Sequence, residues 1–105
     1  MNEQEFNTQA DLMLARIEQA LEACGGDFDW EVKPGGVLEL DFANGSKIII
    51  NRHGAAREIW VAAKAGGFHF RPAGEAWADT RDGSDLLTAL ARCISAQSGE
   101  TIHLG

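Results

Sequence analysis

Hydrophobic side chains recur every three or four positions over residues 3–24, which predicts a long amphipathic helix. Asn2 is placed to cap its N-terminus, and Glu5 stands three residues on, as in a capping box. Gly25-Gly26 supplies a stop at the C-terminal end. The predicted apolar stripe, which must pack against a second layer, consists of Phe6, Ala10, Met13, Ile17, Leu21 and Cys24.

A strict alternation of apolar and acidic residues follows this helix over Asp27–Val32 and predicts a half-buried strand. Phe28, Trp30 and Val32 are expected to face inward and the three acids outward. Asn44-Gly45 is a strong hairpin signal. Short runs separated by turns predict five further strands, at 37–42, 47–52, 57–63, 68–71 and around Trp77.

A second helix is predicted to start at Asp82-Gly83-Ser84 and to end at Gly99, because Leu86, Leu90 and Ile94 lie one turn apart. Connections of hairpin length exclude parallel pairing of the strands. We therefore expect an α+β fold, a two-layer α-β sandwich with both helices packed on one face of a single antiparallel sheet, in the order α-β-β-β-β-β-β-α. A chain of 105 residues with 45% apolar content fits one domain over residues 1–105.

The negative charge of the chain is confined to its first third. Residues 1–31 hold eight acidic side chains and a single base, Arg16, whereas residues 32–105 hold equal numbers of acids and bases. The formal net charge of −7 therefore belongs to one segment, which favours binding of cations or docking to a basic partner. It disfavours nucleic acid, which requires clustered Lys and Arg.

Localisation is predicted to be cytoplasmic. There is no apolar run of membrane-spanning length, and the polar start Met1–Glu5 does not resemble a signal peptide. Cys24 and Cys93 are too few and too far apart for a disulfide framework or a cysteine zinc site, so they are expected to be reduced thiols.

Acidic side chains gather beside the apolar stripe of the first helix. Asp11, Glu18 and Glu22 fall within about 40° of one another on an ideal helix, and Arg16 points away from them. If the strand over 27–32 is the sheet edge beside this helix, its acids extend the same negative surface. Carboxylates suit hard cations, but ligands along a ridge do not converge, so weak, exchangeable sites are expected. An ordinary solvated face is the alternative, and a closed metal site is not expected.

Trp60 is predicted to lie on the open face of the sheet, because it alternates with Ile59 and Val61 and shares its parity with Glu58 and Lys64. A large aromatic side chain in polar surroundings is typical of a protein-binding hot spot, although long neighbouring side chains could instead cover it. The sequence shows no catalytic constellation, so we do not expect an enzyme.

Several blocks, in order and over essentially the whole chain, resemble the bacterial frataxins. These blocks are Asn44-Gly45-Ser46-Lys47-Ile48-Ile49-Ile50-Asn51-Arg52, Ile59-Trp60-Val61-Ala62, Gly66-Gly67-Phe68-His69-Phe70 and the later Trp77. The resemblance implies a frataxin-like fold of two helices on one antiparallel sheet. It also implies iron binding, and regulation of iron–sulfur cluster assembly through contact with the cysteine desulfurase and the scaffold protein.

The resemblance also assigns residues. The implied iron-binding residues, which we call the acidic ridge, are Glu3, Asp11, Glu18, Glu22, Asp27, Asp29 and Glu31. The implied partner-binding residues are Glu18 and Glu22 on the ridge, and Asn51, Arg52 and Trp60 on the exposed surface of the sheet. Gln19, Ala23 and Gly25 stand where related proteins often place further carboxylates, which thins the ridge.

Two other functions remain open at this stage. One is a ferroxidase or iron store that acts without the assembly machinery, and the other is an acidic interaction module whose binding of Fe²⁺ or Fe³⁺ is incidental. A monomer is expected, with iron-induced oligomers as an alternative, and no nucleic acid or membrane partner.

Overall fold

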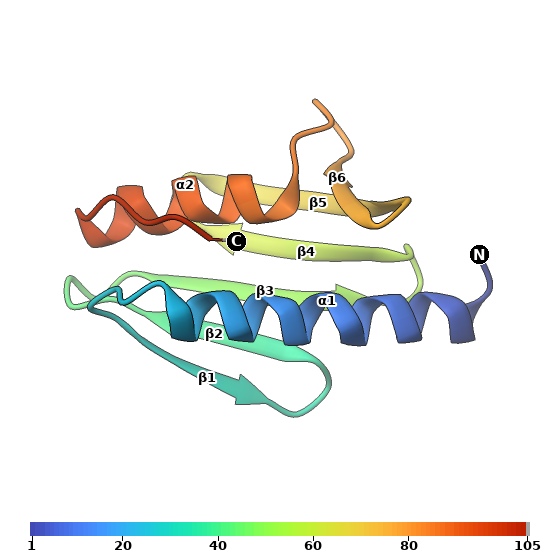
Figure 1. Cartoon of the computed structure of the whole chain (residues 1–105), viewed down its shortest axis with the longest axis horizontal. Coiled ribbons are helices and arrows are strands. Elements are labelled where there is room, and N and C mark those ends of the chain that lie inside the picture. The colour runs from blue at the N-terminus through green and yellow to red at the C-terminus, as the bar shows by residue number, and fades with distance from the viewer. Residues whose placement is uncertain (105) are drawn as a thin grey trace.

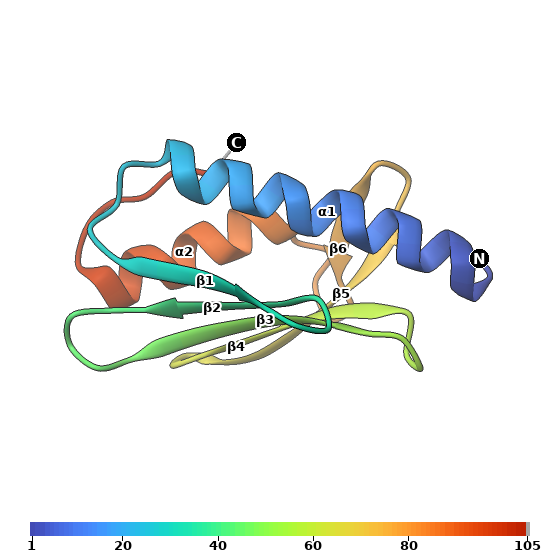
Figure 2. The same cartoon turned by 90° about the horizontal axis from the view of Figure 1, so that it is seen from below.

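Two helices lie on one side of a six-stranded sheet in the computed structural model, which describes residues 1–104 (Figure 1; Figure 2). The strands pair antiparallel in sequence order, from β1 at one edge to β6 at the other. This arrangement confirms the predicted sandwich. The elements are α1 (Glu3–Ala23), β1 (Asp29–Lys33), β2 (Val37–Asp41), β3 (Lys47–His53), β4 (Glu58–Ala63), β5 (Gly66–Ala73), β6 (Ala76–Asp79) and α2 (Leu86–Ser98).

Helix α1 forms where the hydrophobic spacing predicts it. The side chain of Asn2 accepts a hydrogen bond from the backbone N–H of Glu5 at 2.8 Å, which satisfies one of the free donors of the first turn. The predicted apolar stripe is buried, except that Cys24 is half-buried, and Leu14 joins it. The helix ends where Gly25 adopts a left-handed conformation with φ +69°.

Helix α2 begins a few residues later than predicted. Its cap is Asp85, whose carboxylate accepts from the backbone N–H of Thr88. Asp82 instead accepts from the N–H of Ser84 and shapes the turn before the helix. Gly99 ends the helix as predicted, with φ 78°. Within the described chain, no helix is both long and apolar enough to cross a membrane.

The pleat of the sheet separates two faces. On the side of the helices, the β2, β3 and β4 residues Leu38, Leu40, Ile48, Ile50, Ile59 and Val61 are buried in the core. Val32 shares this side, because it pairs with Leu38, yet 57% of its surface is exposed. The prediction that Val32 faces inward is therefore right about the face and wrong about burial, because β1 is the edge strand and lies at the margin of the helical layer.

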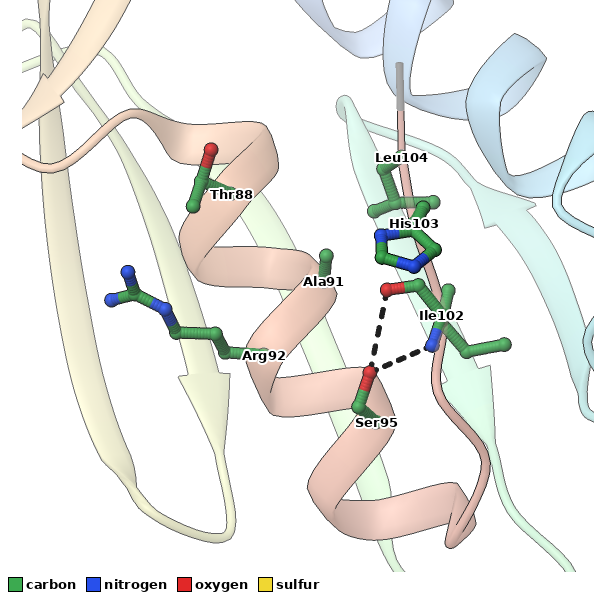
Figure 3. Close-up of a pocket in the computed structure, with 7 residues that line it drawn as sticks. All are labelled: Thr88, Ala91, Arg92, Ser95, Ile102, His103 and Leu104. Atoms are coloured by element: carbon green, nitrogen blue, oxygen red, sulfur yellow. Dashed lines mark hydrogen bonds between the residues drawn. The ribbon is translucent and has the colours of Figure 1, made fainter.

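The segment after α2 packs back on that helix (Figure 3). The Ser95 hydroxyl accepts from the backbone N–H of Ile102 at 2.9 Å and donates to its carbonyl at 3.4 Å, and the Ile102 side chain is buried. The two segments border an open hollow of about 580 Å³, lined by Arg92 and His103 among others (Figure 3). The segment therefore completes the core beside α2.

Candidate functional site

Asp11 and Glu18 of the acidic ridge lie along the edge of α1 that meets the sheet. Glu3, Asp11 and Glu22 are exposed, and Glu18 is half-buried. Asp11 and Glu18 border a hollow of about 180 Å³ that is also lined by the core residue Leu14. The expectation that Asp11 and Glu18 flank the apolar stripe is therefore confirmed.

Arg52 does not lie on the open face with the other predicted partner-binding residues of the sheet. It pairs across β3 and β4 with the buried Ile59, so strand alternation turns it to the side of the helices. Its guanidinium forms an ion pair with the carboxylate of Asp11. The assignment of Arg52 to the open face was therefore wrong. At Asp11 the ridge carries a compensating charge, which comes from a strand distant in sequence.

The strand half of the ridge faces away from the helices. Asp29 and Glu31 alternate with core-facing residues of β1, and Glu31 pairs with Glu39 of β2 on the open face. Lys33 and Lys47 surround Glu39 at 2.7 and 3.3 Å, and Lys33 also lies 3.5 Å from Glu31. Hydrogen bonds from Lys33 and then Lys47 hold the pKa of Glu39 below its ordinary value. The ridge therefore turns around the sheet edge and does not continue along one face as expected.

The seven ridge carboxylates do not converge on one point. No group of three or more His, Cys, Asp or Glu side chains that could hold a metal ion occurs among residues 1–104. Asp11 is already paired with a guanidinium, and Asp27 is exposed in the loop before β1. A site in which the protein supplies most of the coordination shell does not fit this surface. Single exposed carboxylates fit a hydrated hard cation bound weakly.

Trp60 lies on the open face, as its parity predicts, but it is half-buried. It pairs with Asn51 of β3 on one side and His69 of β5 on the other. Its indole ring is stacked between two imidazoles, with centroid distances of 3.9 Å to His53 and 4.5 Å to His69 and interplanar angles of 10°. The two broad faces of the indole are therefore covered by neighbouring rings.

Glu58, which also lies on the open face, is buried, with 5% of its surface exposed. Its carboxylate accepts from Trp60 Nε1 at 2.8 Å and from Arg71 Nε at 2.8 Å, and His69 Nδ1 lies 3.6 Å away. Burial alone would raise the pKa of Glu58, but the hydrogen bonds from Trp60 and Arg71 outweigh it and lower the pKa. Glu58 is therefore buried although it lies on the open face, because its charge is satisfied by Trp60 on its own strand and by Arg71 on the neighbouring strand.

Sequence reasoning missed the grouping of His53, Glu58 and Arg71 around Trp60. The signal was available in the strand alternation, because His53 and Glu58 lie two residues from Asn51 and Trp60 on their own strands and pair with each other. Distinguishing a covered ring from an exposed one required the relative placement of three strands. That placement depends on register, which is a tertiary property.

The chain is similar to known proteins over almost its whole length. A family model described as a frataxin-like domain matches residues 1–100. The chain is 58% identical over 104 residues to the iron-sulfur cluster assembly protein CyaY of Dechloromonas aromatica, covering 99% of each chain. It is 48% identical over 108 residues to the CyaY protein of Cupriavidus necator, covering 100% of this chain and 97% of the relative. Among solved structures, a frataxin from Psychromonas ingrahamii superposes with a TM-score of 0.89 at 36% identity, covering 98% of this chain and 97% of that one.

Proposed function

This chain belongs to the frataxin-like family, and on that premise we propose that it acts in iron–sulfur cluster assembly. Its role is that of a non-enzymatic, iron-binding regulator in the cytoplasm, formed by a single domain that contacts the cysteine desulfurase and the scaffold protein. The observation that carries the proposal is full-length similarity to proteins named for cluster assembly, in a chain that retains both an acidic ridge and a tryptophan-centred open face.

The acidic ridge supports docking to a basic partner. Glu22 is exposed and Glu18 is half-buried one turn before it, and neither belongs to an ion pair among the described residues. Uncompensated charge on a surface steers a partner of opposite sign and accelerates association. Asp11 contributes less to this field, because Arg52 already neutralises it.

The open face supports a second contact. Asn51, Trp60 and Ile49 are half-buried neighbours on β3 and β4, and both helices of the described chain lie on the other side of the sheet (Figure 2). A partly apolar, partly polar patch around a tryptophan is the usual composition of an interface centre. We assign this surface to the partner complex, with Arg52 outside it.

Iron is proposed to bind weakly along the ridge. Residues 1–104 contain no cluster of ligands that could enclose the ion, so the exposed carboxylates leave most of its coordination shell to water and the ion exchanges readily. Bound cation would reduce the negative field that attracts the partner, and in this way the iron level would alter docking.

The decisive experiment measures the rate of cluster formation on the scaffold by the cognate desulfurase, with and without this protein, across a titration of Fe²⁺. We expect an iron-dependent change in rate that is lost in Glu18→Lys/Glu22→Lys. The matched control compares Glu22→Lys with Glu75→Lys, because Glu75 is an exposed glutamate in the turn between β5 and β6. The single ridge variant should weaken desulfurase binding by about tenfold, and the control by less than about twofold.

An unchanged assembly rate at every iron level, with folded protein, would contradict the regulatory role. Faster oxidation of Fe²⁺ than in buffer, in the absence of desulfurase and scaffold, would instead favour an independent iron-handling function. Equal effects of Glu22→Lys and Glu75→Lys would show that total charge matters and the ridge does not.

A further inference from the structure

The indole of Trp60 is fixed by contacts from three strands. His53 comes from the end of β3 and His69 from β5, and each stacks on one broad face of the ring. Glu58, two residues earlier on β4, accepts the indole N–H at 2.8 Å. A ring held on two faces and at its only polar atom cannot change rotamer unless several contacts break together.

Glu58 is itself held in place. Its second carboxylate oxygen accepts from Arg71 Nε at 2.8 Å, and its side chain is only 7% exposed. Arg71 is 67% exposed, so its guanidinium also remains in contact with solvent. The two oxygens of this buried carboxylate accept from different donors, one from the indole and the other from the guanidinium. Because the bond to the guanidinium holds the carboxylate, the other oxygen has a fixed position, and it orients the indole N–H.

We propose that Glu58 is a positioning residue for Trp60. Together with His53 and His69, it holds the indole so that the partner contacts the edge of the ring. The inference rests on the proposed function and adds to it the way in which the open face is presented. Because imidazoles occupy both faces of the indole, the partner does not stack on Trp60. It meets the indole edge, the outer faces of the two imidazoles and the neighbouring amide of Asn51.

Preorganisation of this kind acts on affinity by lowering the cost of ordering the side chain on binding. A freely rotating tryptophan pays that cost at each association, whereas a fixed one does not. Removing the acceptor should therefore weaken binding although Glu58, being buried, offers the partner little surface of its own.

The first measurement needs no partner. In ¹H–¹⁵N spectra of a Trp30→Phe/Trp77→Phe background, the single remaining indole N–H reports on Trp60. We expect Glu58→Met to shift this resonance and to accelerate its exchange with solvent, and Glu58→Gln, which keeps an oxygen acceptor, to change it less. Glu39→Met is the matched control, because Glu39 is a second buried glutamate on the same face that bonds to lysines and not to the indole. An unchanged indole signal in Glu58→Met would overturn the positioning role.

The second measurement is the affinity for the desulfurase–scaffold complex, determined by calorimetry on the full-length variants of the otherwise unaltered chain. We expect Trp60→Ala and Glu58→Met to weaken binding by about tenfold each, Glu58→Gln by less, and Glu39→Met by less than about twofold. If Trp60→Ala binds with the affinity of the parent, the open face does not contact the partner, and the positioning role of Glu58 is overturned as well. Weak binding of Trp60→Ala with parent affinity in Glu58→Met would leave that contact standing and overturn the positioning role alone.

Should Glu58→Met not fold, His53→Ala supplies an independent variant, since it uncovers one indole face without removing the buried carboxylate. It should also weaken binding, and it should leave the indole N–H bond to Glu58 in place. Parent affinity in that variant, combined with weak binding of Trp60→Ala, would equally contradict a preorganised platform.

Discussion

Gln97 joins α2 to the start of β3 and to the turn after β4 through one buried amide. Its Nε2 donates to the Ser46 hydroxyl at 3.0 Å and to the Lys47 carbonyl at 3.1 Å, and its Oε1 accepts from the backbone N–H of Lys64 at 2.9 Å. Only 6% of the residue is exposed. The amide therefore satisfies polar groups of β3 and of the turn after β4 that the helix shields from water.

Replacing Gln97 with Leu keeps a similar volume and removes all three hydrogen bonds. A typical intramolecular hydrogen bond contributes about 0.5–1.5 kcal/mol net, and a buried group left without a partner costs about 1–3 kcal/mol. The gain from burying leucine offsets part of this loss, so we expect a net destabilisation of about 2–4 kcal/mol. For a domain of this size the corresponding fall in Tm is at least about 8 °C.

The free energy of unfolding is measured by urea denaturation followed by circular dichroism, with Gln19→Leu as the control. Gln19 is an exposed glutamine of α1, so the same substitution there should change stability by less than about 0.5 kcal/mol. If Gln97→Leu also stays within about 0.5 kcal/mol of the parent, the amide does not hold the helix to the sheet and the reasoning fails.

Three further predictions concern stability. Trp60→Ala should lower the free energy of unfolding in urea by about 2–4 kcal/mol, because two ring stacks and the hydrogen bond to Glu58 disappear, whereas Trp60→Phe should lower it by less than half of that. If Trp60 were simply exposed on the open face, its removal would leave Tm unchanged, so a parent-like Tm for Trp60→Ala would contradict the prediction. Glu39 has a lowered pKa in the folded state, so its contribution to stability is present above the unfolded pKa and is lost as pH falls through the folded value. In acid titrations followed by circular dichroism, the stability of Glu39→Gln should therefore depend less on pH below about 4.5 than that of the parent. Parallel stability curves for the variant and the parent would refute the assignment. Gly36→Ala should cost about 1–2 kcal/mol or more in urea unfolding, because φ is +75° and a Cβ there would lie 2.7 Å from Arg52 Nε. The backbone strain remains even if the Arg52 side chain moves, so a parent-like unfolding midpoint would contradict the prediction.

Local pattern predicted the elements well because the determinants are local. The apolar stripe of α1, the Asn2 cap and the Gly99 terminus each depend on residues within a few positions of one another. The start of α2 was placed too early because Asp82 and Asp85 both suit a cap, and only the backbone geometry shows that Asp82 serves the preceding turn.

The candidate site was predicted in part. Parity along β4 placed Trp60 on the correct face, and helical spacing placed Asp11 and Glu18 together beside the core. The error at Arg52 arose because it was grouped with Asn51 by position in a shared motif, although adjacent strand residues point to opposite faces.

The sequence by itself determined which segments form helices and strands, which face of each is apolar, and that the negative charge belongs to the first third of the chain. Only the tertiary structure decided which charges meet and which ring is covered. The ion pair of Asp11 with Arg52, and the contacts of Glu58 and His53 with Trp60, depend on strand register and on where α1 crosses the sheet. Side-chain periodicity fixes the direction of each residue within its own element, whereas contacts between elements depend on how the core packs as a whole.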